Sequence, residues 1–477
     1  MESRFSRRFF IGGSASFGVM AACPVVAKAG AAAADGELMK LGVLSDIHID
    51  KPGDELYFKR ALEFFRQRKV DGVVISGDIA DHGTQQQLQI TADAWYGAFP
   101  DDKGIDGRKV EKLFVYGNHC VADWGKDCIA HDRAKAWREA FHEEFEPIWL
   151  KTVKGVPVIG AHWENRKKIG GVRTNEYVVM FDDNEIEEFM RRHGKDFDPS
   201  LPLVYTQHGH PKDTCLGPWA WGHDDGRASR ALAGFPKAVA FTGHSHHTLT
   251  DDRSVWQGAY TSINAASLAG MSHGYPLREN EGGNEFGFRG GDSHPHRMRP
   301  QPSDRGRQGM VVSFGRDHLA IERRDFYFGD RLGDDWVVPY PTADSKPFSF
   351  AARAARRRAP VFAAGAAVTV EQPAPADEKD FHHIEVTFPA ALAVDGCRVT
   401  EYEVTAVLVE DDVELVQAQR RMMSPDHYLP PTQLLKEVSF TFAREDLPIR
   451  GHYRFEVRAL ECFGKKGDKV VSPIVAI

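Results

Sequence analysis

The stretch "KLFVYGNHC", residues 112–120, decides the fold. It opens with an apolar run that is typical of a buried strand, and this run ends at a glycine. Asn118, His119 and Cys120 follow the glycine without a spacer. Because an amide and an imidazole are costly to bury without partners, their place directly after a buried strand needs an explanation.

Four further segments show the same pattern, an apolar run that ends in polar residues. They are "MKLGVLSDIH" (residues 39–48), "VDGVVISGDIAD" (residues 70–81), "LPLVYTQHGHP" (residues 201–211) and "KAVAFTGHSHH" (residues 237–247). Residues 55–68 and 85–99 lie between the first three runs and have helical spacing. Strands that alternate with helices predict parallel pairing and an α/β layered domain. Every polar cluster therefore stands at the carboxyl end of a strand, where open α/β sheets bind their ligands.

The polar residues at the five strand ends form one candidate set of metal ligands. They are Asp46, His48, Asp78, Asn118, His208, His244 and His246. Mixed nitrogen and oxygen ligands without thiolates suit two divalent ions from among Mn, Fe, Zn, Co and Ni. In an extended chain residues i and i+2 share a face, so D-x-H and H-x-H each present both side chains to one side. Asp78 is suited to bridge two ions ~3.5–4 Å apart, the standard clamp for in-line attack at phosphorus.

The charge balance indicates which ligand this site takes. The 477-residue chain has a net charge of −8, so it has no general attraction to nucleic acid or anionic lipid. With Asp46 and Asp78 as the only anionic ligands, two divalent ions leave a surplus of about two positive charges. This surplus explains how an acidic protein can hold a phosphate ester. We predict a phosphate-ester substrate and no nucleic-acid partner, while the residues do not predict an oligomeric state.

Residues 39–330 resemble the calcineurin-like metallophosphoesterase family, whose motifs run D-x-H, G-D, G-N-H, H and G-H-x-H in this order. The resemblance implies a sandwich of two central sheets flanked by helices. It assigns one metal ion to Asp46, His48, Asp78 and His246, and the other to Asp78, Asn118, His208 and His244. It also implies that a metal-bound hydroxide attacks the phosphorus, while the catalytic residue His119 stabilises or protonates the leaving oxygen.

Three positions depart from the family pattern or leave a choice open. Cys120 stands where the family usually has an Asp or Glu that orients the histidine, so Asp123 or another carboxylate would have to take that role. Purple acid phosphatases have a Tyr where this chain has Asp81, so no purple iron–tyrosinate centre is expected. The fourth block offers two histidines, of which we prefer His208, directly after the strand, to His210 as the metal ligand.

Residues near the fourth block and in a long insertion are candidates for substrate binding. Trp219 and Trp221 can stack on a base or sugar, and Arg227 can grip a phosphate. His210 joins this group if it is not a ligand. The insertion, residues 270–308, is rich in Gly, Arg, His and Pro, and it offers Arg289, His294 and His296. Ordinary loop packing or a solvated loop is the alternative interpretation for all of them.

Residues 1–34 resemble a twin-arginine signal peptide. Arg7 and Arg8 precede a short, weakly apolar run, and small residues after it offer cleavage sites. The alternative is an ordinary secretory signal. The apolar run is too short for a membrane anchor. Cys23 fits a lipidation site only loosely. We expect a periplasmic or other extracytoplasmic location, with no integral membrane segment after removal of the signal.

The rest of the chain divides into an α/β domain (residues 37–345), a solvated linker (residues 346–360) and an all-β sandwich (residues 361–477). Alternating strands without a notable helix fill the last part. Leu447 stands six residues before Tyr453, a spacing that resembles the tyrosine corner of fibronectin type III and immunoglobulin-like sandwiches. Cys397 and Cys462 could form a disulfide there after export, which the sequence leaves open.

These observations predict an exported hydrolase of phosphate esters with a dinuclear metal site and an accessory C-terminal sandwich. The residues do not distinguish monoester from diester substrates. The alternative prediction, of a different class, is a catalytically weak metal- and phosphate-binding protein with an adhesive sandwich. Cys120 is the one argument for that alternative.

Overall fold

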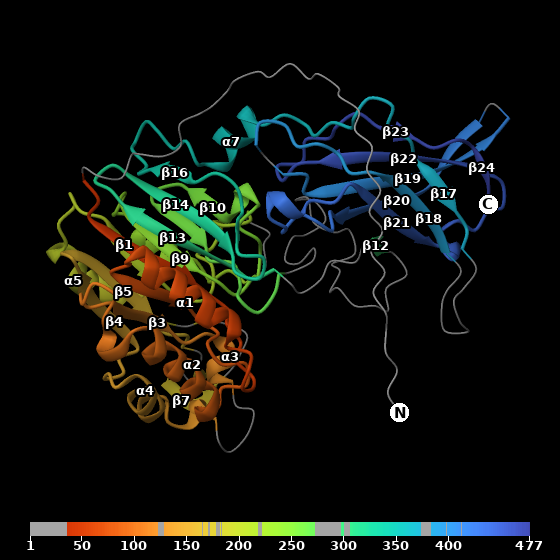
Figure 1. The fold of residues 1–477 in the computed structure, drawn as a ribbon. Coiled ribbons are helices and arrows are strands. Elements are labelled where there is room, and N and C mark those ends of the chain that lie inside the picture. Colours follow the sequence, from red (N-terminus) through yellow and green to blue (C-terminus); the bar gives the residue numbers. More distant parts are fainter. Residues whose placement is uncertain are drawn as a thin grey trace, which may run out of the picture. The chain divides into compact units, whose positions relative to one another are not determined.

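The computed structural model describes residues 36–122, 128–164, 166–169, 172–177, 182, 184–217, 222–271, 297–299, 306–373, 383–396, 398–411 and 413–477 (Figure 1). The predicted signal peptide, with Arg7, Arg8 and Cys23, lies outside these residues. Within the described part of the chain, no helix is long and apolar enough to cross a membrane.

The first sheet contains the three strands that the opening motifs predict. Its strands are β1 (Met39–Leu44), β2 (Gly72–Ser76), β3 (Glu111–Val115), β13 (Gln308–Phe314), β14 (His318–Asp325), β15 (Asp330–Arg331) and β16 (Trp336–Pro339). The order is β15-β14-β13-β1-β2-β3, and β16 pairs with β14. β1, β2 and β3 run parallel, which confirms the parallel pairing, whereas β13 joins β1 antiparallel. β13 and β14 pair antiparallel.

The second sheet contains the two strands that the candidate histidines follow. Its strands are β4 (Ile148–Val153), β5 (Val156–Ala161), β8 (Leu203–Thr206), β9 (Ala238–Thr242), β10 (Val255–Gln257) and β11 (Thr261–Asn264), in the order β10-β11-β9-β8-β5-β4. β5, β8, β9 and β11 run parallel. A separate hairpin pairs β6 (Arg166–Ile169) with β7 (Val172–Tyr177).

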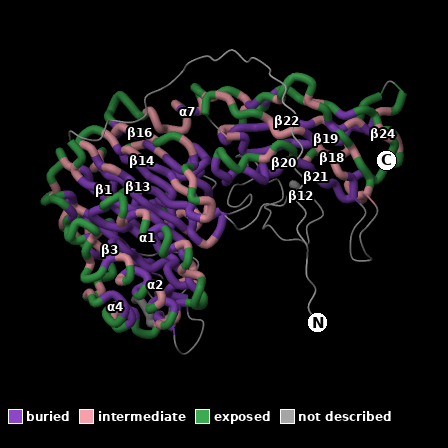
Figure 2. Tube along the Cα trace, viewed as in Figure 1, coloured by how far each residue is buried: buried purple, intermediate pink, exposed green. Residues whose placement is uncertain are grey.

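Helices cover the outer face of each sheet, and apolar side chains fill the space between the sheets. α1 (Leu56–Arg68), α2 (Gln85–Ala98) and α4 (Arg133–Phe141) pack on the first sheet, and α5 (Ile186–His193) and α6 (Arg227–Leu232) on the second. Alternate residues of β1 show the layering, because Val43 faces the second sheet and Leu44 faces the helices. Figure 2 shows these strands as mainly buried. The result is the predicted sandwich of two sheets between helices.

α1 and α2 begin and pack as the sequence indicates. Phe58, Ala61, Leu62 and Phe65 recur at helical spacing on α1 and are its buried face. α2 begins at a capping box, in which the Thr84 side chain accepts from the backbone N–H of Gln87. These helices connect the first three strands and so bring the carboxyl ends of these strands to one edge.

The C-terminal part is all β, as predicted. One sheet has the order β12-β21-β18-β17 and the other β20-β19-β22-β23, with β24 paired to β22. β12 (Arg297–Arg299) comes from the insertion and pairs antiparallel with β21. The C-terminal strands are β17 (Thr369–Glu371), β18 (His383–Pro389), β19 (Glu401–Glu410), β20 (Val413–Met423), β21 (Glu437–Ala443), β22 (His452–Leu460), β23 (Val470–Val471) and β24 (Val475–Ala476). The Tyr453 hydroxyl donates to the Ile449 carbonyl at 2.6 Å, the bond of a tyrosine corner.

The segment predicted as a solvated linker is not fully solvated. It contains α7 (Phe350–Arg356), whose Arg353 is buried and donates to the Val255 carbonyl at 3.2 Å. Arg357 forms an ion pair with Asp252. The guanidinium groups therefore bind acceptors of the α/β part, which the run of arginines alone does not reveal. Cys462 is buried and not in a disulfide, and Cys397 lies outside the described residues.

Candidate metal centre

The predicted ligands come together where the carboxyl ends of both sheets meet. Asp46 and His48 follow β1, Asp78 follows β2, and Asn118 begins the short helix α3 (Asn118–Val121) after β3. The remaining ligands, His208, His244 and His246, follow β8 and β9 of the second sheet. Backbone hydrogen bonds join the first two loops, because Asp46 N donates to Gly77 O at 3.1 Å and His48 N to Asp78 O at 2.9 Å.

The backbone at most of these ligands lies in the left-handed region. The φ angles are 51° at Asp46, 49° at His48, 45° at Asp78, 70° at His244 and 52° at His246. Non-glycine residues avoid this region, and each such residue costs on the order of 1 kcal/mol or more. Conformations of this kind persist only where the surroundings impose them, and they cluster at functional sites.

Glycines that precede the ligands let the loops approach closely. A Cβ atom at Gly77 would clash with the His208 ring, and one at Gly243 would clash with Ser45 and with the carboxylate of Asp46. Gly77 also has a φ of 98°, which glycine adopts at no steric cost. The G-D and G-H-x-H motifs therefore need their glycines to bring the two sheets' loops into contact.

The ligand atoms form two clusters, and Asp78 of the second lies close to the first. In the first, His246 Nε2 lies 3.1 Å from Asp46 Oδ1 and 3.1 Å from His48 Nε2. The second cluster comprises Asp78, His208 and His244. Asp78 Oδ2 lies 3.0 Å from His208 Nε2 and 3.6 Å from His48 Nε2, so its carboxylate reaches both clusters. Whether Asp78 bridges two ions therefore stays a prediction.

Outer hydrogen bonds fix how two of the histidine rings face the site. His208 Nδ1 lies 2.8 Å from the Ser76 carbonyl, so this nitrogen donates and Nε2 is left as an acceptor. His48 Nδ1 lies 2.7 Å from Asp81 Oδ1, which leaves its Nε2 toward the cluster in the same way. Both rings are held in the orientation that a metal ligand requires.

The donor set fits a pair of divalent cations. Asn118 Oδ1 is buried and has no hydrogen-bond partner among the described residues. An acceptor left in this state costs free energy, and a cation would satisfy it. The Nε2 atoms of His48 and His246 face one another at hydrogen-bond distance. Carboxylate, amide and imidazole groups without thiolates suit borderline divalent metals.

The charges of this cluster are strongly coupled. Burial opposes a charge on His48, but the carboxylates of Asp46, Asp81 and Asp78 prevail and raise its pKa to about 10. The pKa of His208 rises to about 9 against its burial because Asp78 and Asp46 are close. Burial and the charge of His208 lower the pKa of His244 to about 3. The pKa values of both ligand carboxyls, although burial alone would raise them, fall because of the surrounding histidines.

Asp81 supplies the carboxylate that orients His119. His119 Nδ1 lies 2.9 Å from the Asp81 carbonyl and 3.3 Å from Asp81 Oδ1, the same oxygen that binds His48. Burial opposes a charge on His119, but the bond to Asp81 and the charge of Asp78 raise its pKa. Asp123, the first substitute named from the sequence, lies outside the described residues. Asp81 is part of the "GDIAD" motif, but the spacing of this motif alone does not reveal its contact with His119.

Cys120 has a different role from that of an orienting acid. Its thiol is fully buried and accepts a hydrogen bond from Ile79 N at 3.2 Å. Burial raises the thiol pKa to about 12, so the group stays neutral. Cys120 therefore packs against the loop between Asp78 and Asp81 and holds it in place.

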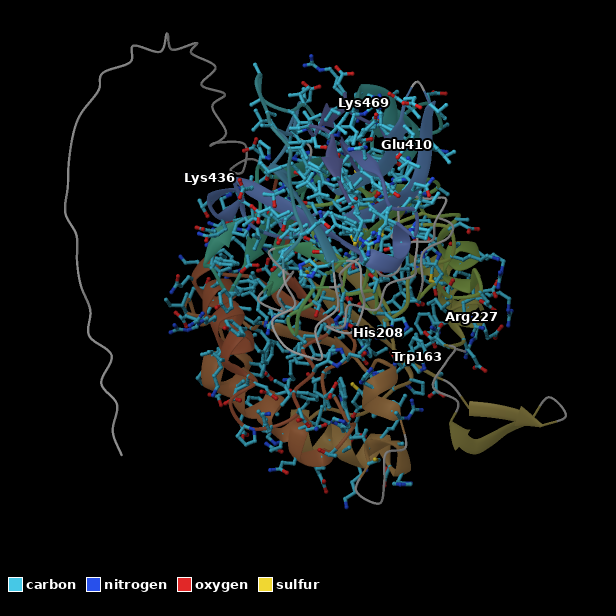
Figure 3. The ribbon with its side chains drawn as sticks, turned by 90° about the vertical axis from the view of Figure 1, so that its right-hand side faces the viewer. Trp163, His208, Arg227, Glu410, Lys436 and Lys469 are labelled. Carbon is cyan, nitrogen blue, oxygen red and sulfur yellow. The ribbon has the colours of Figure 1, made fainter. Side chains whose placement is uncertain are left out.

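A cavity of about 560 Å³ opens over the clusters. It is lined by His48, Asp78, Asp81, Asn118, His119, His244, Ser245, His246, Ala269, Gly270 and Met271. The last three residues lead into the insertion, and sequence reasoning did not single them out. Trp163 was also missed; its ring lies 5.7 Å from that of His208 and 5.4 Å from that of His244 (Figure 3).

Of the other substrate-binding candidates, His210 and Arg227 are described, and neither lines this cavity. His210 is fully buried, and its ring nitrogens lie 2.7 Å from Thr242 Oγ1 and 2.9 Å from Ser245 Oγ. Its hydrogen bonds leave it a packing role, and His208 is the histidine in the cluster. Arg227, labelled in Figure 3, pairs with Asp225 and donates to the Asn184 carbonyl at 2.8 Å. Trp219, Trp221, Arg289, His294 and His296 lie outside the described residues.

The fold and the site together define an α/β domain with two clusters of candidate metal ligands. Residues 39–248 match the family model described as calcineurin-like phosphoesterase. This part of the chain is a calcineurin-like phosphoesterase domain, as its motifs indicate. No curated protein matches the chain.

Several solved structures are similar to the chain at low sequence identity. A dimetal phosphatase from Danio rerio is 9% identical, with a TM-score of 0.40, over 64% of this chain and 100% of that one. GAP50 from Plasmodium is 10% identical, with a TM-score of 0.38, over 64% of this chain and 89% of that one. Vacuolar protein sorting 29 from Cryptosporidium parvum is 10% identical, with a TM-score of 0.30, over 65% and 100%. The family model is therefore the comparison that bears on this chain.

Proposed function

We propose that this protein hydrolyses phosphate esters at a dinuclear metal centre. The observation that carries the proposal is the pair of neighbouring ligand clusters, which Asp78 connects, beneath a cavity bordered by His119. Asp46, His48, Asp78 and His246 would hold one ion, and Asp78, Asn118, His208 and His244 the other. Two such ions supply Lewis-acid charge for the phosphoryl oxygens and activate water as a nucleophile.

The chain's own residues prepare the site for an anionic substrate. Asp46 and Asp78 are the only ionised ligands, so the loaded site keeps a positive surplus over the cavity. The bonds of His48 to Asp81 and of His208 to Ser76 set ring orientation before substrate arrives. Catalysis at phosphorus depends mainly on such positioning and on charge stabilisation.

His119 is the proposed general acid. Asp81 binds Nδ1 of its ring, so Nε2 is on the side of the ring away from this carboxylate. Asp78 and Asp81 favour the protonated ring. In this state His119 can donate a proton to the oxygen of the departing alcohol, which would otherwise leave as an alkoxide.

The test combines metal analysis with turnover. Purified protein loaded with Mn²⁺ should hold two ions per chain and hydrolyse nitrophenyl phosphate or bis(nitrophenyl) phosphate. His119→Ala should keep both ions and lose about 10²–10⁴ of its rate, the usual contribution of a positioned acid. His318→Ala, which changes a histidine of β14 outside the cavity lining, is the matched control. Loaded protein without turnover on either substrate would contradict the proposal.

The alternative of a binding protein without turnover depended on Cys120. Because Asp81 contacts His119, the cysteine no longer argues for a weak site. The same assay separates the alternatives, since a binding protein would bind Mn²⁺ and phosphate but show no turnover.

We further propose that the protein is exported by the twin-arginine route and acts outside the cytoplasm. The proposal is based on Arg7 and Arg8 within residues 1–34. A metal enzyme that folds before export is a natural client of such a route. The C-terminal part, with its tyrosine-corner bond, is proposed to be a fibronectin type III or immunoglobulin-like accessory domain.

A further inference from the structure

We infer that the C-terminal β part positions the metal-binding loop, and that Mn²⁺ affinity depends on this contact. The segment of residues 424–430, between β20 and β21, carries the contact through Gln308 and Thr250 of the α/β part. The inference rests on the proposed metal centre, because it concerns the loop that contains His244 and His246.

Gln308 links the C-terminal segment to the metal-binding loop. Its Oε1 accepts from Leu249 N at 2.8 Å and from the Thr248 hydroxyl at 2.9 Å, three and two residues after His246 respectively. Its Nε2 donates to the Tyr428 carbonyl at 2.8 Å. Gln308 is fully buried, so both ends of its amide depend on these partners.

Thr250 makes a second contact, and its hydroxyl lies 3.0 Å from the Thr248 hydroxyl. Its hydroxyl donates to the carbonyl of His427, the neighbour of Tyr428. Tyr428 and Leu429 also pack into the apolar core between the two sheets, together with Leu249 and Met271. The C-terminal segment therefore touches the far side of the loop whose near side presents the histidines.

The C-terminal segment is itself held in a defined shape. The Ser424 hydroxyl donates to Asp426 Oδ1 at 2.5 Å, and Asp426 Oδ2 accepts from Leu435 N at 3.2 Å. Ser424 N donates to the Thr400 carbonyl of the sandwich at 2.8 Å. A segment fixed in this way can hold the loop that it contacts, whereas a loose one could not.

Gln308 also reaches the loop of Asp46. Gln308 N donates to the Ser267 carbonyl at 2.9 Å, and the Ser267 hydroxyl donates to the Asp46 carbonyl at 3.2 Å. Asp46 Oδ2 in turn accepts from His244 N at 3.0 Å. Three of the five ligands with left-handed backbones, Asp46, His244 and His246, thus lie in loops that Gln308 supports.

The strained backbone of the metal-binding loop explains why it needs this support. Left-handed conformations at His244 and His246 persist only if neighbouring contacts impose them. Without the contact to residues 427–428, the loop would be free to relax, and the apoprotein would have to reorder it on binding a metal. A loop that is already ordered binds the metal ion more tightly, because binding then costs less ordering.

The alternative is that these hydrogen bonds only fasten one part of the chain to the other. Thr432 provides the matched control, because its hydroxyl donates to Asp330 Oδ2 at 2.5 Å and thus joins the same two parts away from the metal loop. Thr250→Val removes a hydroxyl from a buried bond to a carbonyl, and Thr432→Val removes one from an exposed bond to a carboxylate. A fastening role predicts a loss of Mn²⁺ affinity in both variants or in neither, whereas a positioning role predicts the loss in Thr250→Val alone.

The experiment measures Mn²⁺ affinity of the full chain by competition with a chelating dye, together with thermal unfolding of the metal-free protein. Thr250→Val should weaken Mn²⁺ binding about threefold to tenfold, the equivalent of one buried hydrogen bond. Thr250→Ser should restore it, and Thr432→Val should leave it unchanged. Gln308→Met should weaken it at least as much; if this variant does not fold, the threonine pair decides.

The outcomes separate this inference from the proposed function. Equal Mn²⁺ affinity of wild type and Thr250→Val, with wild type binding two ions, would overturn the inference and leave the metal centre intact. Equal losses in Thr250→Val and Thr432→Val would also overturn it. Failure of the wild type to bind Mn²⁺ would instead contradict the proposed function.

Discussion

Replacing Asp81 by Asn tests how His119 is positioned. The change removes the carboxylate 3.3 Å from His119 Nδ1 but keeps the backbone carbonyl 2.9 Å from the same nitrogen. It also changes the oxygen 2.7 Å from His48 Nδ1 to an uncharged one. Asp81 has a pKa well below its usual value, first because of its bond to His119 and then that to His48. The carboxylate is thus ionised and acts on both histidines.

The expected loss lies below that of removing His119 itself. A positioned general acid contributes about 10²–10⁴ to the rate. Since the Asp81 carbonyl still orients the ring in Asp81→Asn, we expect a loss of about 10–10², or about 1.4–2.7 kcal/mol of transition-state stabilisation. The loss should be larger for esters of poor leaving groups, because these need the proton more.

A double-mutant cycle decides which histidine carries the effect. If Asp81 acts through His119, adding Asp81→Asn to His119→Ala should cost little further rate. Metal content, measured by elemental analysis, shows whether the bond to His48 matters for binding. An undiminished loss in the His119→Ala background would refute the reasoning and assign the effect to His48.

Three further predictions concern the bridge, stability and export. Asp78→Ala should lose both ions and all turnover, because the carboxylate reaches both clusters; two ions found by elemental analysis would contradict the bridge. Burial raises the pKa of Asp325 from 3.8 to about 6. Between these values the folded state holds a proton that the unfolded state has lost, so stability falls as pH rises. As the pH rises through this range, the free energy of unfolding of the wild type should fall by about 3 kcal/mol at most relative to that of Asp325→Asn, as measured by chemical denaturation. Replacing Arg7 and Arg8 by Lys should retain the protein in the cytoplasm; normal export, seen by cell fractionation, would indicate the general secretory route.

The sequence predicts the strands that lead to the ligands well, because each combines an apolar run with a metal-binding residue type at its end. An apolar run that ends in a carboxylate or imidazole marks both the strand and its site, as in β2 and β9. β10 and β11 lack such a signal. They are short, and buried Gln257, Ser262 and Asn264 interrupt their apolar pattern. Hydrogen bonds, such as that of Gln257 Nε2 to the Pro339 carbonyl at 2.7 Å, allow these side chains to be buried.

Contacts between distant segments account for the other differences. Arg353 looks like part of a solvated basic run, yet it is buried because the Val255 carbonyl accepts from it. His210 looks like half of an H-x-H pair, but hydroxyls of Thr242 and Ser245 meet its ring. In both cases the residue type is compatible with two environments. The partner that decides between them is remote in sequence and comes near only through the fold.

Local propensity and ligand chemistry disagree at the metal centre, and chemistry prevails. A left-handed position usually selects glycine or asparagine, yet Asp and His occupy five such positions here. No local rule would place a histidine at the backbone conformation of His244. The residue is there because its ring must reach Asp78. The loop is held by hydrogen bonds from His244 N to the Asp46 carboxylate and from Leu249 N to the Gln308 side chain. A chain that accepts this strain at five ligands must support them from elsewhere, so the support extends as far as the C-terminal sandwich.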